Sequence, residues 1–260
     1  MNMHKSPFAS TWLNKVPEVT LSFWIITIMA TAVGETGANA LAAHANVGQG
    51  VTCAAMGELL AFALFTQLCT QRYTPWIYWL TVVLVSIVAT QITDLLTDGL
   101  GLSLYVSTLL FAMGLAGIFA VWFWLDRSLS IHEVFTRRRE LFYWSAILCT
   151  FALGAAAGDL ATEALGFGST WGAVLCGLLI AITYAVWRLG GDAVLTFWIG
   201  YILTRPLGAG LGDTLTHAKT DGGIGMGAMW ASALFLTVIV MLVAVEQSLV
   251  GTPRTTQATK

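Results

Sequence analysis

Acidic residues recur at a fixed spacing inside apolar segments of this sequence. In three such segments an aspartate follows a tryptophan by fifteen residues, and a threonine follows the aspartate by three. The aspartates are Asp94, Asp159 and Asp213, and the threonines are Thr97, Thr162 and Thr216. Residues three apart share one face of a helix, so we expect each carboxylate beside a hydroxyl. Oxygen ligands of this kind suit Mg²⁺, Ca²⁺ or Mn²⁺ better than soft metals, and the same carboxylates could carry protons.

A fourth segment, nearest the N-terminus, carries a variant of this pattern. Asn39 stands at the aspartate position, and Glu35 lies one turn earlier on the same face. Arg205, followed by Pro206, lies two turns before Asp213. An arginine in lipid needs an anionic partner, so we expect Glu35 or one of the aspartates to pair with it. Pro206 is expected to kink its helix, either as a gate or as a static packing feature.

A structural role for the aspartates is the alternative, in which each caps a helix or turns the chain. They lie near helix C-termini, however, where the helix dipole disfavours negative charge. The sequence thus predicts one polar site in which Glu35, Asn39 and the three aspartates converge, with Glu35 and the aspartates as metal ligands. Arg205, Pro206 and a further intramembrane acid, Glu58, are expected to act as counter-charge or gate. No nucleophile, phosphate-loop or dinucleotide motif is present in the sequence, so we expect neither an enzyme nor a cofactor.

Eight apolar segments position these residues. The chain of 260 residues is 57% hydrophobic and 10% charged, whereas soluble domains are about a quarter charged. A helix of about 20 residues crosses a bilayer. Segments of this length occur at 21–42, 49–70, 76–97, 102–125, 141–162, 169–188, 193–216 and 226–248. The predicted fold is an all-α membrane protein of eight transmembrane helices, and a net charge of -2 disfavours nucleic acid as a partner.

Positive charge indicates the orientation in the membrane. With the N-terminus in the cytoplasm, ten Lys and Arg residues lie on the cytoplasmic side, and only Lys219 lies on the other. We therefore expect both termini in the cytoplasm and place the protein in the bacterial cytoplasmic (inner) membrane. The predicted parts are an N-terminal segment (1–20), four hairpin repeats (21–75, 76–140, 141–192 and 193–248) and a C-terminal tail (249–260). The second repeat ends in a basic cytoplasmic loop (126–140).

A fourfold repeat underlies this division. An aromatic residue and a tryptophan open every odd-numbered segment: Phe23-Trp24, Tyr78-Trp79, Tyr143-Trp144 and Phe197-Trp198. Tryptophan at these positions is expected to anchor the helix ends at the lipid headgroups. Small residues follow ten and fourteen positions later, as in Gly154/Gly158 and Gly208/Gly212, and predict close helix packing. The odd-numbered helices should therefore be the inner ones, arranged about a pseudo-symmetry axis along the membrane normal.

The chain resembles a bacterial family of integral membrane proteins of unknown function, built of four tandem two-span repeats. The matching segments are KVPEVTLSFWII (Lys15 to Ile26), VGETGAN (Val33 to Asn39), GDLATEALGFG (Gly158 to Gly168) and ILTRPLGAGLGD (Ile202 to Asp213). Asn39 departs from the resemblance, because the family has an acid there. The GET and GDT triplets are also loosely similar to acidic motifs of small divalent-cation exporters.

These features predict a transporter or exporter of a small cation, divalent and of the Mn²⁺ kind, bound at the repeated acids. The expected partners are the cation or a proton, the lipid bilayer and a second copy of the chain in a homo-oligomer. Two alternatives stay open. One is a membrane binding or regulatory protein that moves no substrate and holds a structural charge network, and the other is a passive channel.

Overall fold

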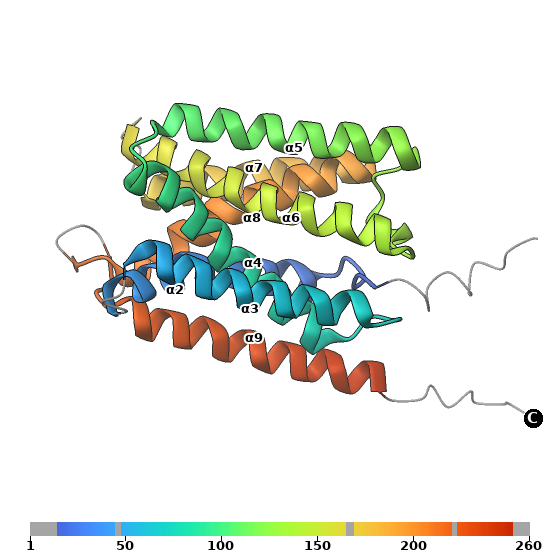
Figure 1. The fold of residues 1–260 in the computed structure, drawn as a ribbon, viewed down its shortest axis with the longest axis horizontal. Helices are drawn as coiled ribbons and strands as arrows, with labels where there is room; N and C mark the ends of the chain where they lie inside the picture. The colour runs from blue at the N-terminus through green and yellow to red at the C-terminus, as the bar shows by residue number, and fades with distance from the viewer. Residues whose placement is uncertain (1–14, 45–47, 165–168, 220–222, 252–260) are drawn as a thin grey trace, which may run out of the picture.

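The computed structural model describes residues 15–44, 48–164, 169–219 and 223–251. Within these ranges all of the regular secondary structure is helical, and eight helices are long and apolar enough to cross a membrane. They are α2 (Leu21–His44), α3 (Gln49–Cys69), α4 (Pro75–Asp94), α5 (Leu104–Asp126), α6 (Arg137–Asp159), α7 (Ser169–Arg188), α8 (Ala193–Thr216) and α9 (Ala228–Gly251). The prediction of an all-α protein with eight membrane-spanning helices is confirmed (Figure 1).

Short helical turns extend or join these helices. The π-helical turns η1 (Leu95–Gly99) and η3 (Leu160–Ala164) continue α4 and α6, and the 3-10 turn η2 (Ile131–Glu133) lies between α5 and α6. Local sequence explains where several helices begin. Pro75 opens α4, and the side chain of Asp192 caps α8 by accepting the N–H of Leu195 at 2.8 Å. Thr136 caps α6 in the same way, so that α6 begins at Arg137, earlier than the apolar segment predicts.

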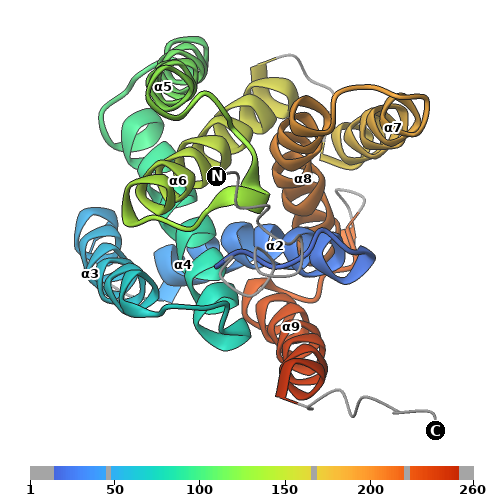
Figure 2. The same ribbon diagram turned by 90° about the vertical axis from the view of Figure 1, so that its right-hand side faces the viewer.

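Four helices form a closed inner ring. Going around it, α2 packs against α4, α4 against α6, α6 against α8, and α8 against α2 (Figure 2). Of the spanning residues in these four helices, 44–56% are buried, compared with 0–22% in α3, α5, α7 and α9. The prediction that the odd-numbered spans are the inner ones is confirmed.

Each outer helix packs mainly on the next repeat rather than on its own. Helix α3 lies against α4, α5 against α6, α7 against α8, and α9 against α2. The last repeat therefore packs on the first and closes the ring. The two helices of a repeat pack little against each other, because the outer helix lies on the inner helix of the next repeat. The start of α2 and the end of α9 lie at the same end of the bundle (Figure 1).

Glycines allow the inner helices to approach closely. A Cβ on Gly208 of α8 would come within 2.0 Å of the Thr31 hydroxyl oxygen on α2, and one on Gly34 of α2 equally close to Ser86 on α4. A Cβ on Gly154 of α6 would lie 2.6 Å from the Cβ of Arg205 on α8. The small residues at the repeated positions thus serve the packing role predicted from their spacing.

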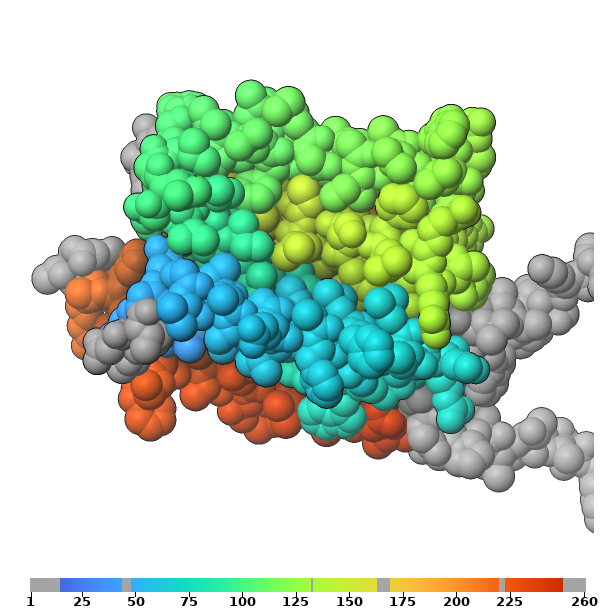
Figure 3. Space-filling view, viewed as in Figure 1, coloured from blue at the N-terminus to red at the C-terminus, as the bar shows by residue number. Residues whose placement is uncertain are grey.

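The outer helices present an apolar surface. On α3 the side chains of Leu59, Phe62 and Phe65 are at least half exposed. Helices α3 and α5 cover much of one face, with α6 visible between them (Figure 3). Such a surface suits contact with lipid tails, as expected for a multi-pass membrane protein.

Candidate functional site: a charge cluster in the inner ring

Arg205 is fully buried inside the ring. From α8 its Nη2 donates to Oε2 of Glu35 on α2 at 3.0 Å and to the Thr90 hydroxyl on α4. Its Nη1 donates to the backbone oxygen of Thr31 on α2 at 3.3 Å. The base of the side chain rests against Gly154 on α6. One arginine thus touches all of the other inner helices.

Glu35 is the anionic partner of Arg205, which resolves the alternatives that the sequence left open. Its second oxygen, Oε1, accepts a hydrogen bond from the amide nitrogen of Asn39 at 3.2 Å. The Glu35 side chain is 17% exposed, whereas that of Arg205 is fully buried. Asn39 therefore has a physical reason to depart from the repeated acid, because an aspartate could not donate this hydrogen bond and would repel Glu35.

Asp213 adds a second carboxylate. It lies two turns beyond Arg205 on α8, interacts electrostatically with Arg205 and Glu35, and contacts the side chain of Ser169 at the start of α7. Its Oδ1 lies 3.8 Å from Nε2 of His217, and its side chain is 19% exposed. The charge cluster, defined here as Glu35, Arg205 and Asp213, is thus buried at its arginine and accessible at its carboxylates. That accessible edge faces the C-terminal ends of the inner helices.

The other two repeated aspartates lie at helix ends. Asp94 and Asp159 are the last residues of α4 and α6, and each interacts with other groups. Among the residues that the structure describes, no three His, Cys, Asp or Glu side chains are grouped so that they could hold a metal ion. The structure thus groups no three of the four predicted metal ligands, Glu35, Asp94, Asp159 and Asp213, as a metal site requires.

The width of the ring limits what side chains on opposite helices can reach. Axes of packed helices lie about 8–10 Å apart, so opposite members of a four-helix ring are about 11–14 Å apart. A short aspartate side chain cannot cross that width, whereas the longer arginine crosses much of it. The three predicted threonines bond within their own helices. Their hydroxyls donate to backbone oxygens of the preceding turn: Thr97 to Thr93 at 3.0 Å, Thr162 to Gly158 at 3.1 Å, and Thr216 to Asp213 at 3.4 Å.

Pro206 lies on an inner helix, whereas Glu58 lies on an outer one. Pro206 lies inside α8, which continues through it. Proline cannot donate to the oxygen of Ile202 one turn back, and this oxygen lies against Gly154 of α6. Glu58 is exposed on the outer helix α3, so its interpretation as an internal counter-charge or gate is wrong.

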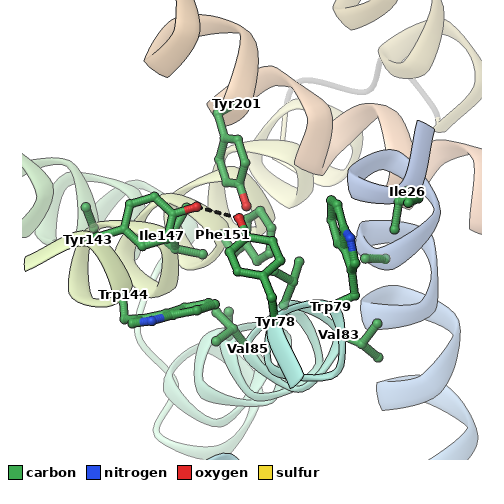
Figure 4. Close-up of a cluster of buried hydrophobic side chains, with 14 of the residues drawn as sticks. Ile26, Tyr78, Trp79, Val83, Val85, Tyr143, Trp144, Ile147, Phe151 and Tyr201 are labelled. Carbon is green, nitrogen blue, oxygen red and sulfur yellow. Dashed lines mark hydrogen bonds between the residues drawn. The ribbon is translucent and has the colours of Figure 1, made fainter. Parts of the chain in front are cut away.

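An aromatic layer fills the inner ring at the N-terminal ends of its helices. Most of the residues that open the repeats are buried. Trp79, Trp144 and Trp198 are 2–4% exposed, and Tyr78 and Tyr143, which Figure 4 labels, are fully buried, whereas Trp24 is half-buried. The prediction of a headgroup anchor is therefore wrong for Trp79, Trp144 and Trp198, and for Trp24 it stays a prediction. The aromatic layer comprises Phe23, Tyr78, Trp79, Tyr143, Trp144, Phe151, Phe197, Trp198 and Tyr201, whose rings contact one another.

Comparison with known proteins agrees with the repeats seen in the fold. The model of the family described as Repeat of Unknown Function (DUF347) matches four segments: 22–73, 77–128, 142–190 and 196–247. The chain belongs to this family. Each matched DUF347 segment holds one inner and one outer helix. No curated protein and no solved structure matches the chain.

The DUF347 repeats differ where the charge cluster lies. Seven residues after the tryptophan stand Thr31, Ser86, Phe151 and Arg205, and eleven residues after it stand Glu35, Thr90, Ala155 and Ala209. The ion pair therefore joins the fourth repeat to the first, across the contact between α8 and α2 that closes the ring.

Sequence reasoning missed a second buried ion pair. Nζ of Lys15 lies 2.6 Å from Oε2 of Glu140 at the start of α6, and both residues are at most 7% exposed. Gln67 of α3 donates to the other oxygen of Glu140 at 3.4 Å. The pair fastens the segment before α2 to α3 and α6. The sequence did not indicate this pair, because Glu140 directly follows three arginines and was therefore assigned to a basic loop.

Glu246 was also missed. On α9 it accepts hydrogen bonds from the Tyr73 hydroxyl at 2.8 Å and from Nε1 of Trp79 at 2.9 Å. Burial and the adjacent carboxylate raise the pKa of Tyr73, so this hydroxyl keeps its proton. An acid inside the last apolar segment was the available signal.

Proposed function

We propose that the protein is a transporter or exporter of a small cation in the bacterial cytoplasmic membrane. In this proposal Glu35 and Asp213 bind the cation, and Arg205 is the internal counter-charge. The observation that carries it is the Arg205–Glu35 pair, buried inside a ring of four spanning helices and close to a second carboxylate. Ionisable groups within a membrane are costly and mark ion pathways.

The charge balance favours a singly charged ion. Two carboxylates and one guanidinium leave the charge cluster with a net charge of -1 when His217 is neutral. One proton or monovalent cation neutralises it, whereas a divalent metal would leave an excess positive charge in a low-dielectric site. The divalent ion expected from the sequence depended on four converging carboxylates, and among the described residues no three His, Cys, Asp or Glu side chains are grouped in that way.

Access from one end supports transport over passive conduction. The carboxylates of Glu35 and Asp213 are partly exposed, while the aromatic layer at the opposite end is buried. A transporter exposes its site to one side at a time. A passive channel needs a continuous open path, which a packed aromatic layer opposes.

The test is ion movement in vesicles that contain the purified protein. Movement of H⁺, Na⁺, K⁺, Mg²⁺ and Mn²⁺ would be compared for the wild type, Glu35→Gln, Asp213→Asn and Glu58→Gln. We expect saturable movement of a monovalent ion, a reduction of at least tenfold in the first two variants, and no change in Glu58→Gln. The Glu58 variant is the matched control, because it removes a carboxylate from an exposed position on α3.

Two results would reject the proposal. One is a wild-type protein that moves none of these ions. The other is wild-type movement in a Glu35→Gln/Asp213→Asn double variant. A charge network with a purely structural role predicts the first result, together with lower stability of the variants.

A further inference from the structure

Buried tyrosine hydroxyls gather in the aromatic layer. The hydroxyl oxygens of Tyr78 on α4 and Tyr143 on α6 are 2.6 Å apart and share a hydrogen bond. Tyr201 of α8 points its hydroxyl toward this pair and interacts with both (Figure 4). All three residues are fully buried, and the Tyr201 hydroxyl has no hydrogen-bond partner in the part of the chain that the structure describes. Three inner helices thus bring their hydroxyls together inside the ring.

Ionisable groups flank this tyrosine cluster on both sides. Toward the N-terminal ends of the inner helices, the ring of Tyr73 contacts that of Tyr78 at 5.6 Å, and the Tyr73 hydroxyl bonds to Glu246. Toward the other end, Tyr201 precedes Arg205 by four residues, so the two lie on one face of α8. The tyrosine cluster therefore lies between the carboxylate of Glu246 and the charge cluster.

Polar atoms continue between Tyr201 and the charge cluster. The hydroxyls of Thr150 on α6 and Ser86 on α4 are buried, as is Nε of Arg205, and none has a hydrogen-bond partner among the described residues. Thr150, Ser86 and Arg205 follow the tryptophan of their repeat by six or seven residues, whereas Tyr201 follows it by three. They therefore lie about one helical turn further from the N-terminal ends than Tyr201. Buried polar atoms in native proteins are nearly always hydrogen-bonded, often to internal water.

We propose that these side chains form a proton path from Glu246 and Tyr73, through the tyrosine cluster, to Glu35 and Asp213. The inference rests on the proposed function and identifies its ion as the proton. Each hydroxyl accepts a proton on a lone pair and releases its own hydrogen to the next group, so only O–H bonds form and break. Rotation of the hydroxyls then restores the starting arrangement. Water molecules bridge Tyr201 to the charge cluster along Thr150 and Ser86.

The chemistry of the tyrosine cluster selects the proton over a metal cation. Three hydroxyls provide no negative charge, and a bare metal ion in a low-dielectric interior without an anion is strongly disfavoured. A proton needs no anion at the tyrosine cluster, because it passes along hydrogen bonds rather than as a separate ion. The packed aromatic rings also leave little room for a metal ion.

The experiment measures proton entry into vesicles that hold the full chain and an internal pH-sensitive dye, with valinomycin and a potassium gradient to drive it. The variants are Tyr201→Phe and Tyr143→Phe, and the control is Tyr105→Phe at an exposed position on α5. We expect Tyr201→Phe to slow proton entry at least tenfold and Tyr105→Phe to leave it unchanged. Because the Tyr201 hydroxyl bonds to no described residue, its removal should not lower thermal stability.

The outcomes separate this inference from the proposed function. Wild-type proton entry in both Tyr201→Phe and Tyr143→Phe overturns the path. If Tyr143→Phe fails to fold, Tyr201→Phe decides alone. Glu35-dependent movement of another ion, without proton entry, also overturns the path but leaves the proposed function standing. A wild-type protein that moves no ion overturns both.

Discussion

Removing either partner of the Arg205–Glu35 pair should destabilise the fold by different amounts. Breaking a buried ion pair costs about 3–5 kcal/mol, because the remaining charge is left uncompensated. In Glu35→Gln, Arg205 stays charged and fully buried and keeps its hydrogen bonds to Thr31 and Thr90. It loses its ion-pair contact and retains the electrostatic interaction with Asp213, which is not a direct ion pair. A cost within this range is therefore expected.

The opposite variant, Arg205→Gln, leaves the Glu35 carboxylate without its cation. This side chain is 17% exposed and keeps its hydrogen bond from Asn39, whereas the Arg205 side chain is fully buried. Water and the Asn39 amide therefore stabilise the remaining charge in Arg205→Gln better than the buried site stabilises Arg205 in Glu35→Gln. We expect Arg205→Gln to lose less stability than Glu35→Gln.

The assay is thermal unfolding in detergent, followed by the fluorescence of the 11 tryptophans. For chains of about this size, 1 kcal/mol corresponds to roughly 2–4 °C, so Glu35→Gln should unfold about 6–20 °C below the wild type. The double variant Glu35→Gln/Arg205→Gln should recover much of that loss. An equal or larger loss in Arg205→Gln than in Glu35→Gln would refute this account of the pair.

Two further predictions concern packing and the second ion pair. Gly208→Ala should prevent stable folding or lower the unfolding temperature strongly, because its Cβ would lie 2.0 Å from the Thr31 hydroxyl and 2.8 Å from a backbone oxygen of α2. The control is Gly57→Ala on α3, whose Cβ would meet nothing within 4 Å, so this variant should be tolerated. Equal stability of the two alanine variants would contradict the close contact between α8 and α2. Lys15→Met should lower the free energy of unfolding by about 3–5 kcal/mol, because it leaves Glu140 buried without its cation. The double variant Lys15→Met/Glu140→Gln should recover most of this loss. Both are measured by thermal unfolding, and an unchanged single variant would show that Glu140 does not depend on Lys15.

The sequence was sufficient to predict the helices and their inner or outer position, but not how they pair. Apolar length identified eight spans, and the small residues around Gly154 and Gly208 identified the inner helices. The packing of α9 on α2 was not predictable, because an outer helix that packs on its own repeat and one that packs on the next share the same local pattern. Only tertiary packing decides between them.

Side-chain direction explains the errors at the site. Phe197 and Trp198 are adjacent and thus about 100° apart on α8, yet both are buried because each inner helix is covered by two ring neighbours and an outer helix. A headgroup anchor would require one side to stay free. The partner of Arg205 was predictable as a matter of charge, since an arginine inside a membrane protein needs an anion. That Glu35 rather than Asp94 would supply it depended on the rotation of α2 and α4.

The repeat also explains why the site lies where the copies differ. Four identical groups on a fourfold ring would place like charges around one axis, where they repel in a low-dielectric interior. A charge pair near that axis must therefore break the symmetry, and here one repeat supplies Arg205 and the next supplies Glu35, while Ala155 and Ala209 at the equivalent positions are small. The repeated aspartates differ from this pair. They occupy equivalent positions in their repeats, so the symmetry of the ring distributes them around the axis. Within such a repeat, the polar residues that the copies do not share are the ones that can form an ion pair near the axis without like-charge repulsion.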